Sequence, residues 1–368
     1  MGSRVATGWS EALQRHWWRA PGAIAPLPLR ALGLALWPLS WLYSALVESR
    51  RAAYSAGLLR RHHVGVPVVV VGNLIVGGAG KTPTTLALVH LLRAAGWTPG
   101  IVSRGHGRRG GSIVEVKANS RPLDVGDEPL LLHRNSSAPV VVGVDRVAAA
   151  RALLAQHPDV DLIVSDDGLQ HLRLARDVEV IVFDERGVGN GHLLPAGPLR
   201  EALPAKVPPQ SLVLYNAAAP STTLPGALAQ RSLGAVLPLA AWWRGEAPAA
   251  QSWAALQSRR LLAVAGVAAP ERFFTMLQAR GLQIERLKLP DHHDFATLPW
   301  PAGTADVVLT EKDAVKLDPA RLGSTQVWVA TLDFTLDAAF TAALLARLPS
   351  RRPDHPPPRP ARQGQPPS

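Results

Sequence analysis

A glycine-rich segment ending in Lys81 and Thr82 carries the residues whose types and spacing most clearly support chemistry. It follows four consecutive valines, Val68 to Val71, which predict a strand buried on both faces. Glycines let successive backbone N–H groups turn toward phosphate oxygens, the lysine supplies positive charge to the β- and γ-phosphates, and the threonine hydroxyl can ligate Mg²⁺. The segment therefore predicts a loop that binds the phosphates of a nucleotide together with Mg²⁺.

The residues around this loop give it the strand–turn–helix context that such a site requires. Pro83 suits a first helical turn, apolar residues repeat at helical spacing from Leu86 to Leu92, and Gly96 suits the C-terminal end. Ile75 stands where the strict motif has glycine, so the match is to the second half of the motif. A glycine-rich turn without a ligand is the alternative. The residues expected to contact the nucleotide are Asn73, Gly77, Gly78, Ala79, Gly80, Lys81 and Thr82.

A pair of carboxylates, Asp166 and Asp167, follows the apolar stretch 160–165, which predicts a second buried strand. In enzymes with such a loop, an acidic residue at a strand end holds Mg²⁺, directly or through water, opposite the threonine of the loop. Read alone, the two aspartates could equally cap a turn. Together with the loop, they predict a metal site formed by Thr82, Asp166 and Asp167.

Alternating strands and helices predict an α/β protein with a P-loop NTPase-like parallel sheet domain and a second, smaller α/β domain. In the first domain, the predicted strands are 98–102, 138–144, 160–165 and 178–183, and the predicted helix is 146–156. In the second domain, the predicted strands are 261–265, 283–287 and 307–310, and the predicted helix is 270–280. The region 208–248, rich in Ala, Pro and Leu, indicates a boundary.

The expected division of the chain follows from these patterns. It comprises an N-terminal membrane-associated helical segment (1–55), the P-loop core (56–207), the smaller C-terminal α/β domain (208–348) and a proline-rich, disordered tail (349–368).

The composition limits the classes of partner. The 368 residues carry a net charge of +11 and no cysteine, which excludes disulfides and thiolate metal sites. The basic residues are spread along the chain with few aromatics between them, so no nucleic acid partner is expected. An anionic membrane surface or an anionic substrate explains the same charge.

The N-terminal region contains seventeen uncharged residues, 31–47, long enough for about 26 Å of helix. Arginines flank it on both sides, so the charge bias expected of a spanning helix is weak. A helix lying in the membrane interface is therefore favoured, and a helix buried against the domain is the alternative. Tryptophans, which prefer headgroup depth, support the interface, and they are Trp9, Trp17, Trp18, Trp37 and Trp41.

An ordered set of short motifs resembles the tetraacyldisaccharide 4'-kinase (lipid A 4'-kinase) family over about residues 20–345. The set is Gly72-Asn73, Gly77-Gly78-x-Gly80-Lys81-Thr82-Pro83, Ser103-Arg104-Gly105, Gly126-Asp127-Glu128-Pro129, Asp166-Asp167-Gly168-x-Gln170-His171, Pro195-Ala196-Gly197-Pro198-Leu199-Arg200-Glu201, Asp291-His292-His293 and Thr310-Glu311-Lys312-Asp313. The order and spacing make the resemblance specific.

The resemblance implies ATP- and Mg²⁺-dependent phosphorylation of the 4'-hydroxyl of a tetraacylated glucosamine disaccharide 1-phosphate in lipid A biosynthesis. It implies action at the cytoplasmic face of the inner membrane of Gram-negative bacteria, with the protein peripheral or anchored by one helix. The family's loop also lacks the strict first glycine, so Ile75 is a shared departure. His106 is a departure of this chain, because the family usually has tyrosine there.

Phosphoryl transfer to a sugar hydroxyl requires in-line placement, neutralisation of charge and a group that accepts the proton. We expect Lys81 and the loop amides to hold the phosphates and Asp127 to act as the base. His292, in the second domain, is expected to orient Asp127 and share the proton, so that catalysis depends on domain closure. His293 is the alternative histidine. Adjacent histidines on a strand point apart, which argues against a metal site.

Further residues are expected to complete the site. Arg200 and Glu201 are assigned to the phosphate and metal environment, and a structural role is expected for Lys312 and Asp313. The candidates for contacts with the phosphate and sugars of the substrate are Arg104, Arg146, Gln170 and His171.

Two other classes of protein remain as alternatives. A regulatory nucleotide switch on a membrane would explain the loop and the basic charge, but it gives no role to Asp127 and His292 together. A nucleic-acid ATPase is the third interpretation.

Overall fold

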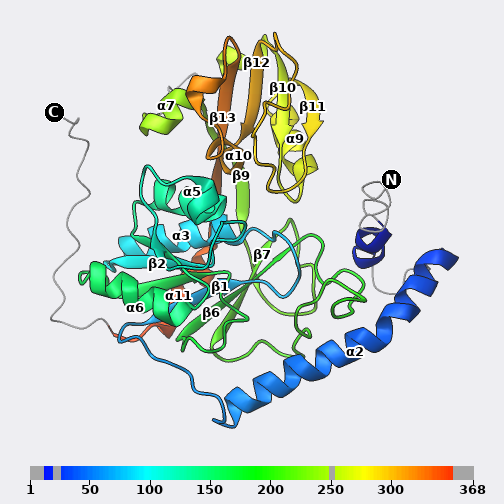
Figure 1. Ribbon diagram of the computed structural model, residues 1–368, viewed down its shortest axis with the longest axis vertical. Coiled ribbons are helices and arrows are strands. Elements are labelled where there is room, and N and C mark those ends of the chain that lie inside the picture. Colours follow the sequence, from blue (N-terminus) through cyan, green and yellow to red (C-terminus); the bar gives the residue numbers. More distant parts are fainter. Residues whose placement is uncertain (1–11, 20–25, 248–252, 351–368) are drawn as a thin grey trace.

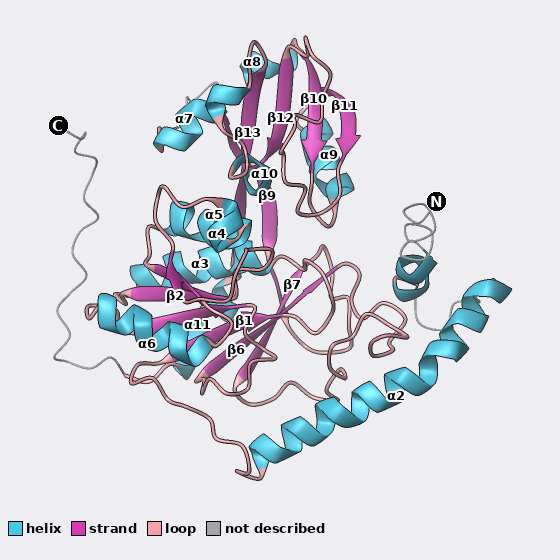
Figure 2. Ribbon diagram, in the orientation of Figure 1, coloured by secondary structure: helices cyan, strands magenta, loops and turns pink. Residues whose placement is uncertain are grey.

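The computed structural model describes residues 12–19, 26–247 and 253–350, and these form two α/β units with a long helix beside the larger one (Figures 1 and 2). The larger unit has an eight-stranded sheet of order β3-β4-β2-β5-β1-β6-β7-β8. The smaller has a five-stranded sheet of order β11-β10-β12-β13-β9. The α/β class and the two sheets predicted from the sequence are confirmed. The predicted tail lies outside the described residues from 351 onward, as does Trp9.

The strands of the first sheet are β1 (Val68–Gly72), β2 (Pro99–Ser103), β3 (Val114–Glu115), β4 (Val140–Val142), β5 (Leu162–Asp166), β6 (Val178–Asp184), β7 (Ser211–Asn216) and β8 (Ala227–Leu228). All neighbouring strands are parallel except β3 and β4. Val71 of β1 pairs with Asp166 of β5. The loop after β1 and the carboxylates after β5 therefore meet at one edge of the sheet, where open α/β sheets bind ligands.

The helices of the larger unit are α3 (Lys81–Ala94), α4 (Pro122–Val125), α5 (Asp127–Ser136) and α6 (Arg146–Gln156). They cover both faces of the sheet, which is why the central strand reads as an unbroken apolar run. Val69 and Val71 join the apolar cluster of α3 and α5. Val68 and Val70 join the cluster that contains α6. Burial on both faces holds β1, and with it the loop that follows, in a fixed position.

The smaller unit contains β9 (Gln230–Pro238), β10 (Arg260–Ala265), β11 (Gln283–Lys288), β12 (Asp306–Thr310) and β13 (Gln326–Thr335), with helices α7 (Leu239–Arg244), α8 (Ala254–Gln257), α9 (Pro270–Ala279) and α10 (Glu311–Ala314) and the 3₁₀ turn Pro319–Arg321. β9 and β13 are antiparallel and long, and together they descend from the smaller sheet to the larger unit (Figure 1). This two-stranded ribbon connects the two units.

The boundary expected at residue 208 does not coincide with the boundary between the sheets. β7 and β8 extend the first sheet, although the sequence placed them in the second domain. The final helix, α11 (Ala338–Arg347), also lies beside the larger unit, where Arg347 Nε donates a hydrogen bond to the carbonyl of Pro209 (3.4 Å). The sequence analysis missed β7 and β8 because the Ala- and Pro-rich composition of region 208–248 hid these strands.

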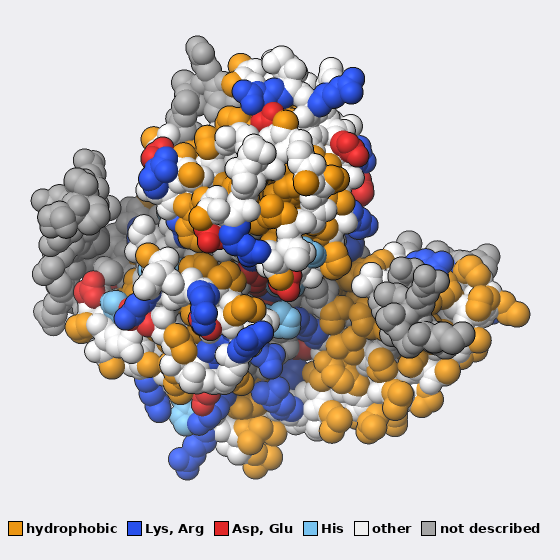
Figure 3. Space-filling view, turned by 45° about the horizontal axis from the view of Figure 1, so that its top comes forward, with side chains coloured by type: hydrophobic (Ala, Val, Ile, Leu, Met, Phe, Trp, Pro, Cys, Tyr) orange, Lys and Arg blue, Asp and Glu red, His pale blue; other side chains and the backbone are white. Residues whose placement is uncertain are grey.

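The long N-terminal helix α2 (Leu27–Ser55) contains the predicted apolar run and continues through Pro38. It is the one helix within the described ranges that is long and apolar enough to cross a membrane. Ser40 is its only buried residue, so the alternative of a helix buried against the domain is wrong. Trp37 and Trp41 are 60% and 81% exposed. Figure 3 shows the hydrophobic side chains that gather along this helix.

Candidate active site

The loop after β1 has the backbone that its glycines predict. Gly77 and Gly80 have φ angles of +85° and +89°, a region that favours glycine. A Cβ on Gly80 would lie 2.1 Å from Asn216 Nδ2, so a side chain there would displace the buried side chain of Asn216. Lys81 Nζ donates to Asn73 Oδ1 and to the carbonyl of Gly77, both at 3.3 Å. The lysine is thus folded over the loop.

Asp166 and Asp167 occupy different environments although they are adjacent. Thr85 Oγ1 and Ser103 Oγ donate to the two carboxylate oxygens of Asp166 at 3.0 and 3.2 Å. Burial raises the pKa of Asp166 to about 7. Burial also acts to raise the pKa of Asp167, but the charges of Lys81 and Arg200 outweigh it and lower that pKa. Asp167 is therefore the carboxylate that is ionised beside the loop.

Asp167 is the centre of a polar network that joins three predicted site residues. Its Oδ1 lies 3.6 Å from Lys81 Nζ and 3.3 Å from Arg200 Nη1. Arg200 also donates to Gln170 Oε1 (3.2 Å), and Gln170 Nε2 donates to the carbonyl of Asn73 (3.2 Å). The network links the loop to the chain segment at Arg200, as the sequence predicts for Arg200 and Gln170.

Arg146 and His171 line the same region, while Arg104 is exposed. Arg146 Nη2 donates to the carbonyl of Asp167 (3.4 Å), and burial lowers the pKa of Arg146 to about 10. The positive charge of Arg104 lowers it further, so these two arginines lie near one another. Burial and the charge of Arg146 lower the pKa of His171 to about 4. His171 is therefore neutral at physiological pH.

The two units meet at Asp127 and His292. Asp127 is the first residue of α5, where the helix dipole favours a carboxylate. His292 lies in the loop after β11, and its Nδ1 is 2.9 Å from Asp127 Oδ2. Burial acts to raise the pKa of Asp127, but the hydrogen bond from His292 and the charge of Lys312 lower it to about 2. The hydrogen bond to Asp127 in turn raises the pKa of His292.

Lys312 belongs to this cluster, although the sequence analysis expected a structural role for it. Its Nζ contacts Glu128 Oε1 at 3.0 Å, Asp291 Oδ1 at 3.2 Å and His292 Nε2 at 3.4 Å. An ammonium group can only donate, so Nε2 of His292 is the acceptor and Nδ1 carries the proton toward Asp127. Glu128 and Asp291 stand next to Asp127 and His292 in the sequence motifs, and these carboxylates could have indicated a cationic partner such as Lys312.

The two adjacent histidines, His292 and His293, make different contacts. His293 Nδ1 accepts a hydrogen bond from the N–H of Phe295 (3.1 Å), and its ring packs against the Phe295 ring. It does not contact Asp127, so the structure brings His292, the first choice, to the carboxylate. Both histidines lie in a loop and not on a strand. His106 has its ring centroid 5.5 Å from that of His292.

Glu201 departs from the position expected for it. It is buried and forms an ion pair with Arg51 of α2. Tyr43 Oη of the same helix donates to the carbonyl of Arg200 (3.0 Å). Ser40 Oγ donates to the carbonyl of Leu193 (2.7 Å). In this structure Glu201 holds α2 against the loop 189–201, and Arg200 alone of the two extends to Asp167.

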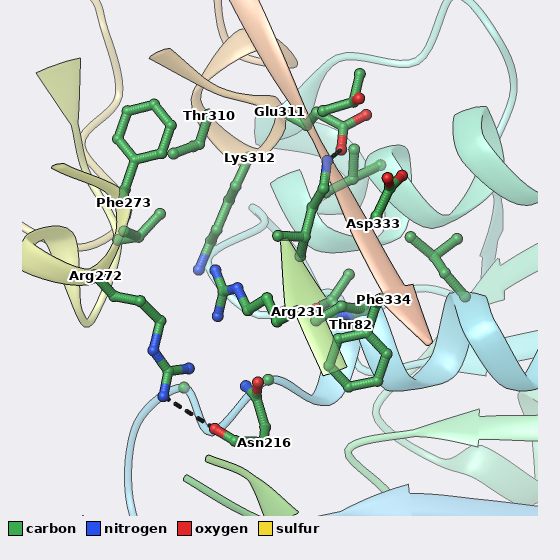
Figure 4. Close-up of a pocket in the computed structure, with 18 of the residues that line it drawn as sticks. Thr82, Asn216, Arg231, Arg272, Phe273, Thr310, Glu311, Lys312, Asp333 and Phe334 are labelled. Atoms are coloured by element: carbon green, nitrogen blue, oxygen red, sulfur yellow. Dashed lines mark hydrogen bonds between the residues drawn. The ribbon is translucent and has the colours of Figure 1, made fainter. Parts of the chain in front are cut away.

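A cavity of about 730 Å³ lies between the two units, and the loop residues Gly78 to Thr82 form one wall. The opposite wall includes residues of β9, α9, α10 and β13 (Figure 4). Thr82, Arg231, Arg272 and Lys312 all face this cavity in the close-up. It is large enough for a nucleotide.

The residues near the loop fit a magnesium ion that is shared with phosphates. Among the described residues, no group of three or more His, Cys, Asp or Glu side chains could hold a metal ion alone. Mg²⁺ is usually held by one or two carboxylates together with substrate phosphates and water. Thr82 lines the cavity and Asp167 lies beside Lys81, so both can supply oxygen donors of that kind, whereas the two oxygens of the buried Asp166 already accept hydrogen bonds from Thr85 and Ser103.

A phosphate-binding loop on one α/β unit and an aspartate–histidine pair joining it to a second define a P-loop phosphotransferase. The comparisons with known proteins identify which one. The family model described as tetraacyldisaccharide-1-P 4'-kinase matches residues 32–349, and the chain belongs to this family. It is therefore a kinase of lipid A synthesis that phosphorylates a lipid A precursor at the 4' position.

Individual relatives agree with this assignment. The chain is 57% identical over 308 residues to the tetraacyldisaccharide 4'-kinase of Leptothrix cholodnii, covering 83% of this chain and 88% of the relative. It is 56% identical over 306 residues to that of Methylibium petroleiphilum, covering 82% and 86%. A crystal structure of LpxK from Aquifex aeolicus, described as its "apo" form in complex with ATP, is 25% identical with a TM-score of 0.70 and covers 86% of this chain and 99% of that one. The family resemblance inferred from the motifs is confirmed.

Proposed function

We propose that the chain transfers the γ-phosphate of ATP to the 4'-hydroxyl of tetraacyldisaccharide 1-phosphate, with Asp127 as the base. The observation that carries this proposal is the 2.9 Å contact between His292 Nδ1 and Asp127 Oδ2, whose neighbours Glu128 and Lys312 line the same cavity as the phosphate loop. A carboxylate held ionised there, with one oxygen free of His292, is suited to accept the proton of a sugar hydroxyl.

The remaining roles follow from the contacts. Lys81 and the loop amides hold the β- and γ-phosphates. When ATP binds, these phosphates replace Asn73 and Asp167 as the partners of Lys81. Arg200 balances the charge of Asp167. His292 holds Asp127 in one orientation and donates to it throughout proton transfer. Its Nε2 is occupied by Lys312, which fixes this tautomer.

Mg²⁺ is the metal that this donor set suits. Thr82, Asp166 and Asp167 would hold it, and when bound it would neutralise charge on the phosphates being transferred. The hydroxyl donors on Asp166 and the cations on Asp167 orient both carboxylates without any ion present.

A position on the cytoplasmic face of the bacterial inner membrane suits both substrates, since ATP is cytoplasmic and the acceptor carries four acyl chains. Extracting such a lipid costs about 0.8 kcal/mol for each CH₂ group, so the enzyme must act at the bilayer. Exposed apolar residues along α2 supply the membrane contact, and the pair Arg51–Glu201 joins that helix to the site.

The test is transfer of ³²P from γ-labelled ATP to tetraacyldisaccharide 1-phosphate in detergent. Asp127→Asn keeps the shape of the side chain but removes the base, and we expect it to lower kcat by roughly 10²–10⁴-fold. Asp124→Asn changes an exposed carboxylate in the preceding helix and is the matched control. Equal activity of the Asp127 variant and the control would exclude Asp127 as the base.

A further inference from the structure

Arg231 faces the cavity from the ribbon that connects the two units. It lies on β9, where it pairs with Phe334 of β13, and both residues line the cavity opposite the phosphate loop. Figure 4 shows its guanidinium group directed into the cavity between Thr82 and Lys312. Neither the motifs nor the polar networks described above include this residue.

The guanidinium of Arg231 is not satisfied by the protein. Its Nε is buried and has no hydrogen-bond partner among the residues that the structure describes. The carboxylate of Asp184 acts on its charge, but Arg186 already holds that carboxylate, with Nε 3.0 Å and Nη2 2.6 Å from Oδ2. Arg272, the neighbouring arginine on the cavity wall, is different because it pairs with Glu185 and donates to the carbonyl of Asn216 (3.0 Å).

Arg231 is half-buried, and a guanidinium with a buried nitrogen that makes no hydrogen bond costs folding free energy, so it indicates a ligand that supplies the missing acceptor. Burial lowers the pKa of Arg231 to about 10, which still leaves the side chain positively charged at physiological pH. Both an ATP polyphosphate and the 1-phosphate of the lipid could pair with it. The phosphate loop lines the same cavity, whereas Arg146 lies beside Asp166 and Asp167.

We propose that Arg231 binds the phosphates of ATP from the side opposite the phosphate loop, so that the nucleotide bridges the loop and the connecting ribbon. This inference rests on the proposed use of ATP. Arginine suits the position because its planar guanidinium can contact two phosphate oxygens at once. ATP binding then draws on both units, since β9 pairs with β13 of the smaller sheet.

The test measures nucleotide binding to the full chain without lipid, so its outcome does not depend on whether phosphoryl transfer occurs. Arg231→Met removes the charge, Arg231→Gln removes it while keeping polarity, and Arg260→Met is the control, at an exposed arginine at the start of β10. We expect both Arg231 variants to bind ATP and ADP at least about tenfold more weakly, while the affinity for adenosine is unchanged. The KM for the lipid should not change.

Thermal melting without ligand distinguishes this role from a structural one. Replacing a half-buried cation whose Nε makes no hydrogen bond should leave the melting temperature of the ligand-free protein equal or higher, while the stabilisation by added ATP decreases. An unchanged ATP affinity in whichever Arg231 variant folds would overturn the proposal. A higher lipid KM with normal ATP binding would also overturn it and would assign Arg231 to the lipid phosphate.

Discussion

Substitutions at His292 should distinguish its two ring nitrogens, because only Nδ1 contacts Asp127. Asn places an N–H donor near the position of Nδ1, Gln places one near Nε2, and Ala places none. We therefore expect His292→Asn to retain more activity than His292→Gln or His292→Ala. The hydrogen bond from His292 is the first of the contacts that lower the pKa of Asp127 from 3.8 to about 2, against its burial.

The stabilisation of the ionised form follows from that pKa. The net shift from 3.8 to about 2 corresponds to roughly 2 kcal/mol at 1.36 kcal/mol for each pKa unit, and His292, Lys312 and Lys316 share it against burial. That energy stabilises the ionised carboxylate, so the loss of rate follows from the lost orientation of Asp127, and we expect kcat of His292→Ala to fall by about 100-fold. The pKa of Asp127 should also rise in His292→Ala, so the acid limb of the pH–kcat profile should move to higher pH. His292→Asn should keep the limb near its wild-type position.

The assay is lipid phosphorylation in detergent at saturating ATP, measured from pH 3 to pH 9, so that a rise of the Asp127 pKa to 3.8 or above falls within the measured range. His292 has a φ of +61°, a conformation that Asn tolerates better than Gln or Ala, so thermal melting of each variant is the control. Equal losses in all three variants, with no movement of the acid limb, would refute the role assigned to Nδ1.

Two further predictions concern pH dependence and membrane contact. Burial and the charge of Arg146 lower the pKa of His171 from 6.5 to about 4. As the pH decreases from 6.5 to 4, His171 is protonated in the unfolded chain before it is protonated in the folded protein, so the free energy of unfolding falls. Urea unfolding at pH 7 and pH 5 should therefore show a smaller decrease in this free energy for His171→Gln than for the wild type. The double variant Trp37→Ser, Trp41→Ser removes two exposed aromatics of α2, and co-sedimentation with anionic vesicles should fall at least about tenfold, whereas ATP affinity measured by titration should not change. Equal losses of vesicle binding and of ATP affinity would contradict the membrane role of α2.

The sequence predicted those parts of the fold that depend on local patterns. Helix α6 begins and ends where the spacing of its apolar residues indicates, with Asp145 capping its first turn. The valines of β1 predicted a central strand because both of its faces are covered. The strands β7 and β8 were assigned to the wrong unit, since the sheet to which a strand belongs is decided by long-range pairing. Their surroundings in the chain gave no such information.

The candidate site divides in the same way. The phosphate loop was readable because its backbone geometry requires glycines at fixed positions, as the close contact of Gly80 with Asn216 shows. Glu201 is paired with Arg51, and that pairing depends on where α2 docks, which no local motif reveals. Arg231 gave no signal in the sequence, because its significance is the absence of a partner in a folded cavity.

Analysis of the reaction product would test the central claim most directly. The purified chain, γ-³²P-labelled ATP and tetraacyldisaccharide 1-phosphate are incubated with Mg²⁺ in detergent, and the labelled lipid is examined by NMR to locate the new phosphate. We expect label in the lipid, with the phosphate on the 4'-oxygen. Release of inorganic phosphate without labelled lipid, or a phosphate at another hydroxyl, would contradict the proposed reaction.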